Sequence, residues 1–163
     1  PLHYGVPQCS ILGPLLFVLY INDLPQCLLK SQISMYADDT VIYFSGTKSC
    51  NIEVTLQSDI NKVEGWLLEN RLVLNLSKTN VLLFGTIQKL GNVSSFNVKF
   101  QDQAIERVSK FIYLGITLDE NLNWKEHVDA VGIKANKCLS LLARIRPCLN
   151  LKASKCVYNC LIL

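Results

Sequence analysis

Two short runs that favour β-structure, residues 32–36 and 40–44, flank the tripeptide Ala37-Asp38-Asp39. Such runs around a short polar link predict a β-hairpin. Adjacent carboxylates repel each other at a tight turn, and no helix N-terminus or cationic neighbour is evident beside them. A divalent cation would make the pair favourable, because Mg²⁺ is held by one or two carboxylates plus substrate phosphates. Asp is also common in turns because of local hydrogen bonding, so the acids alone leave both interpretations open.

The residues around this hairpin predict a mixture of helices and strands. Ser10 is placed to cap a helix that ends before Pro25, and its apolar residues lie on nearly all faces, which is typical of a buried helix. Apolar residues at spacings of three and four predict an amphipathic helix over 50–71. Further strands are expected at residues 72–76, 81–84, 96–100 and 111–118.

The last quarter of the chain is helical and basic. Its apolar residues again recur at spacings of three and four (Val128, Val131, Ala135, Cys138, Leu142, Ile145). Asn123 and Glu126 resemble a capping box, Pro147 ends the helix, and a second helix is expected from about Lys152. Residues 123–163 carry seven basic and two acidic side chains, whereas residues 1–122 carry nine and eleven. A cationic segment of this kind attracts polyanions such as nucleic acid, although solvated lysines on a helix face are an equally good explanation.

Composition excludes several classes of protein. Half of the 163 residues are hydrophobic and only 8 are Gly and 5 Pro, which excludes disordered, collagen-like and coiled-coil chains. The 7 cysteines are odd in number and unclustered, so buried free thiols in a reducing compartment are expected rather than disulfides or zinc. The longest apolar stretch, residues 11–21, is too short to span a bilayer, and no signal peptide is evident. We therefore expect an intracellular protein of the nucleus or cytoplasm that is not secreted and has no membrane partner. Both ends suggest a fragment of a longer chain.

Four motifs in a fixed order change the balance of these interpretations. They are Gly5-Val6-Pro7-Gln8-Cys9-Ser10 through Phe17 with Tyr20-Ile21-Asn22-Asp23-Leu24-Pro25; Tyr36-Ala37-Asp38-Asp39; Trp66, Asn70, Leu72, Leu74, Asn75 and Lys78-Thr79; and Tyr113-Leu114-Gly115-Ile116 with Asp119, Leu122, Trp124 and His127. In this order they resemble the reverse transcriptase of non-LTR, LINE-like retrotransposons, of the jockey-like kind. The resemblance covers essentially the whole chain.

The resemblance implies an α+β fold: a polymerase palm, with an antiparallel sheet, packed helices and a catalytic β-hairpin, followed by a helical thumb segment. Residues 1–122 would be part of the palm and residues 123–163 the start of the thumb, with the fingers and the early palm missing. The implied activity is that of an RNA-directed DNA polymerase, using two-metal nucleotidyl transfer in the intact parent. Its partners would be an RNA template, a DNA primer and dNTPs, with Mg²⁺ or Mn²⁺ as cofactor and no stable protein partner.

The resemblance also implies roles for individual residues. Asp38 and Asp39 would be catalytic metal ligands, and Lys78 would protonate the pyrophosphate leaving group. Nucleotide and template contacts would come from Gly5, Pro7, Gln8 and Tyr36, and a primer grip from Tyr113, Leu114 and Gly115. As isolated residues, Trp66 and Trp124 are more typical of a core, and His127 of a packing residue than of a metal ligand.

Two departures from the family pattern favour an inactive fragment. The family's third catalytic aspartate belongs to an earlier motif that is absent here, and Asp23 lies in a helix-end segment where it cannot replace that residue. Cys9 stands where the family has glycine, which removes the conformational freedom of that position.

Two alternatives to an enzyme fragment therefore stay open. One is a decayed or domesticated copy that only binds nucleic acid. The other is a different palm polymerase, an RNA-dependent RNA polymerase or a group II intron maturase, against which the quoted motifs argue. In isolation, uncovered sheet edges and apolar faces predict low solubility.

Overall fold

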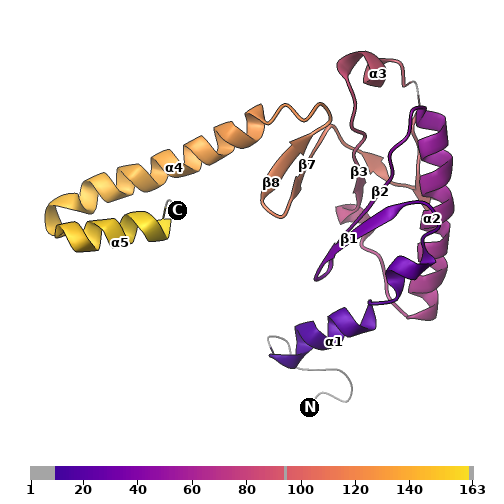
Figure 1. Ribbon diagram of the computed structural model, residues 1–163, viewed down its shortest axis with the longest axis horizontal. Coiled ribbons are helices and arrows are strands. Elements are labelled where there is room, and N and C mark those ends of the chain that lie inside the picture. Colours follow the sequence, from indigo (N-terminus) through magenta and orange to yellow (C-terminus); the bar gives the residue numbers. More distant parts are fainter. Residues whose placement is uncertain (1–9, 94, 162–163) are drawn as a thin grey trace. The chain divides into compact units, whose positions relative to one another are not determined.

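The computed structural model describes residues 10–93 and 95–161 and mixes helices with short strands, as an α+β chain should (Figure 1). Its contacts divide the chain into two compact units. The first contains residues up to 81 together with 88–108, and the second contains residues 82–87 together with those from 109 onward. The predicted palm–thumb boundary between residues 122 and 123 lies within the second unit and stays a prediction.

The first helix, α1 (Leu12–Tyr20), begins where Ser10 caps it. The Ser10 hydroxyl oxygen accepts the backbone N–H of Gly13 at 3.1 Å, as predicted. None of the residues of α1 is buried, so the prediction of a buried helix is wrong for this chain. Only Phe17 packs against the nearby core, and the Tyr20 hydroxyl donates to the Asn70 carbonyl oxygen. The other large apolar side chains of the helix face solvent because no described segment covers them.

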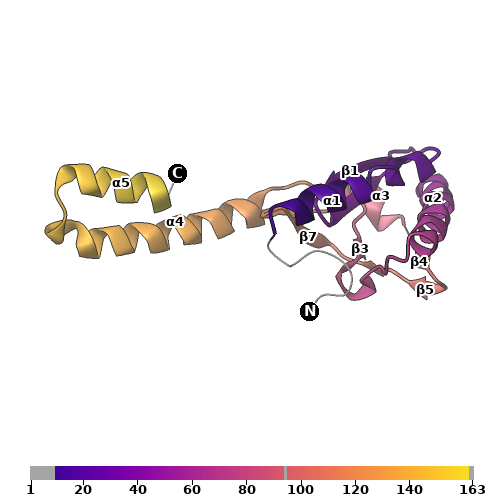
Figure 2. The ribbon, with the colours of Figure 1, turned by 90° about the horizontal axis from the view of Figure 1, so that it is seen from below.

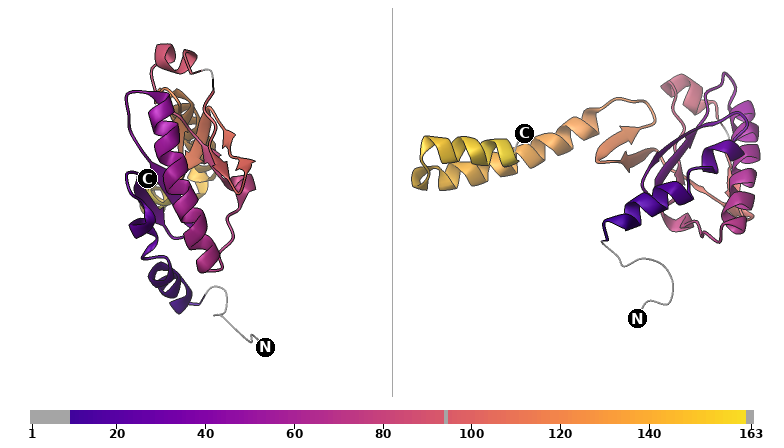
Figure 3. Two further views of the ribbon diagram at one scale, coloured as in Figure 1. Left: turned by 90° about the vertical axis from the view of Figure 1, so that its right-hand side faces the viewer. Right: turned by 60° about the horizontal axis from the view of Figure 1, so that its bottom comes forward.

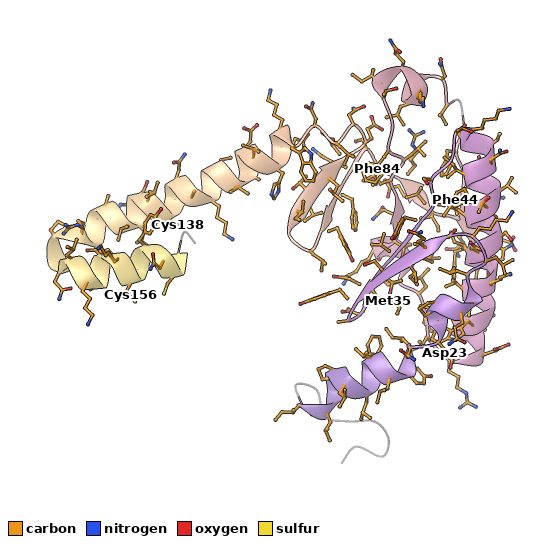
Figure 4. The ribbon with its side chains drawn as sticks, viewed as in Figure 1. Asp23, Met35, Phe44, Phe84, Cys138 and Cys156 are labelled. Atoms are coloured by element: carbon orange, nitrogen blue, oxygen red, sulfur yellow. The ribbon has the colours of Figure 1, made fainter. Side chains whose placement is uncertain are left out.

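The predicted hairpin is present, with its second strand beginning and ending one residue earlier than expected. Strand β1 (Gln32–Tyr36) pairs antiparallel with β2 (Asp39–Tyr43), and Tyr36 is opposite Asp39. Exposure alternates along β1, with Ile33 and Met35 half-buried between exposed neighbours. Met35 is labelled on this strand in Figure 4. Ile33 and Met35 therefore share an apolar face with Ile42, whereas the other face mixes polar side chains with Tyr36, Val41 and Tyr43.

Helix α2 (Ser49–Glu69) carries the core of the first unit. Val63 and Trp66 are buried with Ile21 and with Leu24 of the short 3₁₀-helix η1 (Leu24–Cys27). The half-buried side chains of the hairpin, Ile33, Met35 and Ile42 among them, pack on the same cluster. Trp66 is thus a core residue, as predicted.

The predicted strand at 72–76 is wrong, because α2 ends in a left-handed turn that redirects the chain. Arg71 has a φ of 53°, and the Leu72 N–H bonds the Leu67 carbonyl oxygen at 2.9 Å while the Arg71 N–H bonds the Leu68 carbonyl oxygen at 3.2 Å. This is the Schellman pattern of helix termination. The 3₁₀-helix η2 (Leu76–Lys78) follows.

The strands predicted at residues 81–84 and 96–100 are only two residues long each, and the short strands that pair with them were not predicted. β3 (Asn80–Val81) pairs parallel with β6 (Glu106–Arg107), and β4 (Lys99–Phe100) pairs antiparallel with β5 (Gln103–Ala104). The turn between β4 and β5 places Gln101 and Asp102 at φ values of 48° and 61°. Helix α3 (Ile87–Gly91) spans the boundary between the units.

In the second unit, the single strand predicted at 111–118 is two strands. β7 (Lys110–Tyr113) and β8 (Ile116–Asp119) form a hairpin, because Leu114 and Gly115 both have positive φ, 48° and 83°. Two central residues of positive φ are what a tight type I′ hairpin turn requires.

Helix α4 (Lys125–Ile145) is followed by the 3₁₀-helix η3 (Arg146–Cys148) and helix α5 (Leu151–Leu161), and α4 and α5 lie side by side (Figure 2). The predicted capping box is wrong. Trp124, at a φ of 60°, occupies the N-cap, and Glu126 instead pairs with Lys110 at 3.1 Å. Asn150 caps α5, since its side-chain oxygen accepts the Ala153 N–H at 2.8 Å.

The described cysteines are free thiols, but the prediction that they are buried is wrong. Cys27 and Cys138 are half-buried, and Cys50, Cys148, Cys156 and Cys160 are exposed. Figure 4 labels Cys138 on α4 and Cys156 on α5. Burial raises the pKa of the Cys27 thiol, and the nearby carboxylates of Asp23 and Glu69 add to the effect. Among the described helices, none is both long and apolar enough to cross a membrane.

Candidate active site

The acidic pair lies at the tip of the β1–β2 hairpin. Ala37 and Asp38 form the two-residue turn, and Asp39 is the first residue of β2, opposite Tyr36. Ala37 has a φ of 52°, the left-handed conformation that tight hairpin turns require. Both acids are exposed. The hairpin thus presents two adjacent carboxylates to solvent, with the Tyr36 side chain exposed beside them.

The donor set at this tip fits a hard divalent cation. Carboxylate oxygens are the ligands that Mg²⁺ takes in proteins, and it is commonly held by one or two of them plus phosphate oxygens and water. Within residues 10–93 and 95–161, no cluster of three or more His, Cys, Asp or Glu side chains could hold a metal. Two protein ligands are therefore what this part of the chain offers, and the remaining positions suit water and phosphate.

Lys78 lies in the same unit as the hairpin, at the end of η2. Its side chain is exposed, while a local hydrogen-bond network fixes its backbone. The Lys78 N–H donates to the Asn75 carbonyl oxygen at 3.1 Å, and the Thr79 hydroxyl donates to the same oxygen at 2.9 Å. The ammonium of Lys78 is therefore at the surface, on a backbone held by local hydrogen bonds.

The predicted primer grip forms the β7–β8 turn of the second unit. Tyr113 is half-buried and ends β7, while Leu114 and Gly115 make the turn and are exposed. The predicted nucleotide contacts Gly5, Pro7 and Gln8 lie outside the described residues, as does Cys9.

Basic side chains of α4 border a shallow groove within the second unit. The groove has a volume of about 580 Å³ and is lined by Ile133, Asn136, Lys137, Ser140, Leu141 and Arg144. The apolar stripe predicted for this helix lies on a different face. Ala135, Cys138, Leu142 and Ile145 of this stripe are half-buried, whereas Val128 and Val131 are exposed. Figure 3 shows α5 running back along α4. The helix thus keeps one face for α5 and another, with two cations and two polar side chains, for solvent or a ligand.

The first turn of α4 is fixed to the β7–β8 hairpin. His127 accepts the backbone N–H of Thr117 on its Nδ1 at 3.3 Å, and its ring meets that of Trp124 edge to face at 6.4 Å. His127 is therefore a packing residue, as predicted. Trp124 is 47 % exposed, so its prediction as a core residue is wrong; its place at the N-cap keeps it at the surface.

Sequence reasoning missed Asp59, a charged residue on the inner face of α2. It is only 1 % exposed, and its carboxylate accepts three backbone N–H groups from the segment before β1. Burial by itself would raise the pKa of this carboxyl, but these hydrogen bonds outweigh it and hold the pKa below its usual value. Its spacing from Val63 and Trp66, four and seven residues, was the available signal, because it puts an acid on the apolar face.

Comparison with known proteins connects this arrangement to a family. The family model described as "Reverse transcriptase (RNA-dependent DNA polymerase)" matches residues 1–118. No solved structure matches the chain significantly.

Several relatives from insects are similar over most of the chain. The probable RNA-directed DNA polymerase from transposon BS of Drosophila melanogaster is 31 % identical over 159 residues, 92 % of this chain and 17 % of the relative. That from transposon X-element of the same species is 29 % identical over 76 % of this chain and 14 % of the relative. The RNA-directed DNA polymerase from mobile element jockey of Drosophila funebris is 27 % identical over 97 % of this chain and 18 % of the relative. The chain thus spans less than a fifth of the length of each of these relatives.

Proposed function

This chain belongs to the reverse transcriptase family, and from that premise we propose that it is the part of an RNA-directed DNA polymerase that carries the catalytic hairpin. The similar proteins are polymerases of mobile elements, non-LTR retrotransposons by resemblance, and the same origin is proposed for this chain. In this assignment residues 1–122 are part of the palm and residues 123–163 begin the thumb. The observation that carries the proposal is the pair Asp38-Asp39 at an exposed hairpin tip inside the matched segment.

The acidic pair would hold a divalent metal ion, Mg²⁺ or Mn²⁺. When bound there, the ion supplies charge stabilisation to the phosphate oxygens of a nucleotide that is joined to a primer. Asp38 and Asp39 would contribute oxygen ligands, and both side chains are exposed, so a phosphate can approach the tip. In this reaction the primer 3′-hydroxyl would give up its proton to water and bond to the α-phosphorus while the bond to pyrophosphate breaks.

Lys78 would act on the leaving group. A positioned ammonium can donate a proton to the departing pyrophosphate or stabilise its charge. The exposed side chain on a hydrogen-bonded 3₁₀-turn suits either role.

The template and primer would be held through their phosphates. Phosphate contacts position a duplex without reading its bases, which suits an enzyme that copies any template. The basic groove face of α4 and the β7–β8 turn with Tyr113, Leu114 and Gly115 are the candidate contacts. Gly5, Pro7, Gln8 and Tyr36 complete the proposed nucleotide and template site.

Manganese binding to the chain tests the metal assignment directly, because bound Mn²⁺ is counted by electron paramagnetic resonance. We expect binding to the natural chain to weaken at least about tenfold in Asp38→Asn and in Asp39→Asn. Asp102→Asn is the matched control: it removes an exposed carboxylate from another turn of the same unit, at a φ of 61° that Asn tolerates. Equal Mn²⁺ affinity in all four proteins would contradict the assignment.

A further inference from the structure

Asp59 is a buried acid that accepts three hydrogen bonds from the N–H groups of one backbone segment. Its Oδ1 accepts the N–H of Leu29 at 3.0 Å, and its Oδ2 accepts the N–H groups of Lys30 at 3.2 Å and Ser31 at 2.8 Å. Buried charges persist in proteins when they are paired or fully hydrogen-bonded. Three converging donors need a group that only accepts, and a carboxylate is the side chain that meets this need.

These three donors lie immediately before the strand that leads to the acidic pair. Ser31 is followed by Gln32, the first residue of β1, and β1 runs without interruption to Tyr36. On the same strand Ile33 and Met35 pack on the cluster that contains Val63, one helical turn from Asp59. The base of the hairpin is thus held to α2 twice, by hydrogen bonds at residues 29–31 and by apolar contact at residues 33 and 35.

We propose that Asp59 is a positioning residue for the acidic pair, which fixes where β1 starts on α2 and thereby where Asp38 and Asp39 are presented. This inference rests on the proposed function only where it takes Asp38 and Asp39 to hold a metal ion. The register of a strand has a period of two, so a slip of one residue at the base would turn Ile33 and Met35 outward and move the tip. The hydrogen bonds to three successive residues oppose such a slip.

The test compares three variants of the whole chain by amide hydrogen exchange and by Mn²⁺ affinity. Asp59→Asn keeps the size of the side chain but places an NH₂ group against backbone N–H donors. Val98→Ala destabilises the same unit from a site that is 1 % exposed and lies outside the cluster contacted by Ile33 and Met35. Asp129→Asn removes an exposed acid from α4 and controls for the charge change.

The expected result is selective. In Asp59→Asn, amides of residues 29–43 should exchange at least about tenfold faster than in the natural chain, while amides of residues 62–69 should stay better protected than those of 29–43. The Mn²⁺ affinity should fall about 10–100-fold, as it does when outer partners of metal ligands are removed. Val98→Ala should leave the Mn²⁺ affinity unchanged even if its urea midpoint falls as far as that of Asp59→Asn.

Two results would overturn the inference: unchanged exchange at residues 29–43 in Asp59→Asn, or an equal loss of Mn²⁺ affinity in Val98→Ala. If the natural chain binds no Mn²⁺, the proposed metal site fails, and hydrogen exchange alone decides whether Asp59 positions the hairpin.

Discussion

The side-chain amide of Gln57 forms hydrogen bonds with both backbone groups of Lys99, its N–H and its carbonyl, as a residue of a neighbouring strand would. Gln57 Oε1 accepts the Lys99 N–H at 2.8 Å, and Gln57 Nε2 donates to the Lys99 carbonyl oxygen at 2.9 Å. Glu53, one turn earlier on α2, accepts the Asn97 N–H at 3.2 Å. Helix α2 thus supplies hydrogen-bonding partners to an edge that the two-residue strand β4 leaves open.

Removing the hydrogen bonds between Gln57 and Lys99 should lower the free energy of unfolding. Gln57→Ala deletes both hydrogen bonds to Lys99 and the one that Gln57 Nε2 donates to Asn61 Oδ1. Because water can reach the site, we expect a loss of about 1 kcal/mol in the free energy of unfolding. Urea denaturation followed by circular dichroism measures it. Gln88→Ala, at an exposed residue of α3, should leave the midpoint unchanged. A Gln57→Ala midpoint equal to that of the natural chain would show that the hydrogen bonds of Gln57 contribute nothing to stability.

The low pKa of Asp59 makes stability depend on pH in a defined direction. A carboxyl whose folded pKa lies below its unfolded value of about 3.9 stabilises the fold above that value, and the contribution is lost as pH falls through the folded pKa. Urea midpoints measured between pH 7 and pH 2 should fall on the acid side in the natural chain and fall less steeply in Asp59→Asn. Asp129→Asn should follow the natural chain, because Asp129 is exposed.

Two glycines predict opposite effects of the same substitution. Gly115 has a φ of +83°, so Gly115→Ala should destabilise the β7–β8 hairpin by about 1–2 kcal/mol. Gly132 lies inside α4 with open space around its Cα, so Gly132→Ala should stabilise the chain by about 0.5–1 kcal/mol. Thermal unfolding of both variants checks the pair, and shifts of equal sign would contradict the turn geometry.

The basic groove face predicts salt-dependent binding to duplex nucleic acid. Lys137→Gln with Arg144→Gln removes two cations that line the groove, and the slope of log affinity against log salt should decrease by about two. Fluorescence anisotropy with a labelled duplex across a salt series measures the slope. Lys62→Gln on α2 is the control cation. An unchanged slope in the double variant would remove α4 from the proposed interface.

The chain by itself should not extend a primer. The resemblance implies a third catalytic aspartate in an earlier motif that residues 1–163 do not supply, and within the described residues no third acidic ligand joins Asp38 and Asp39. Incubation with a primed RNA template, Mg²⁺ and dNTPs, resolved on a sequencing gel, tests this. Products above those of Asp38→Asn would show that the two acids suffice.

Elements with a strong periodic pattern were predictable from the sequence, whereas elements fixed by single backbone conformations were not. The helices around Val63 and Leu142 and the acidic hairpin follow from periodicity and turn composition. The hairpin at Leu114-Gly115 and the end of α2 depend on positive φ at Leu114 and Arg71, two non-glycine residues whose conformation composition does not mark.

The candidate site divides in the same way. The paired acids stand out because two charges at a turn are unusual. Asp59 escaped notice because one acid in a helix resembles a solvated one until the donors of residues 29–31, twenty-eight to thirty residues earlier, are seen around it. The prediction of a capping box at α4 was wrong for a similar reason. Glu126 pairs with Lys110, which lies outside the helix, instead of taking part in the cap that its spacing suggested.

The left-handed backbone of Ala37 has a practical consequence for synthesis. An L-residue there crowds its Cβ against the following carbonyl, whereas the mirror-image residue adopts the same φ of 52° without crowding. A chemically assembled chain with D-alanine at this one position would therefore keep the backbone and every other side chain in place and hold the two acids on a stiffer turn.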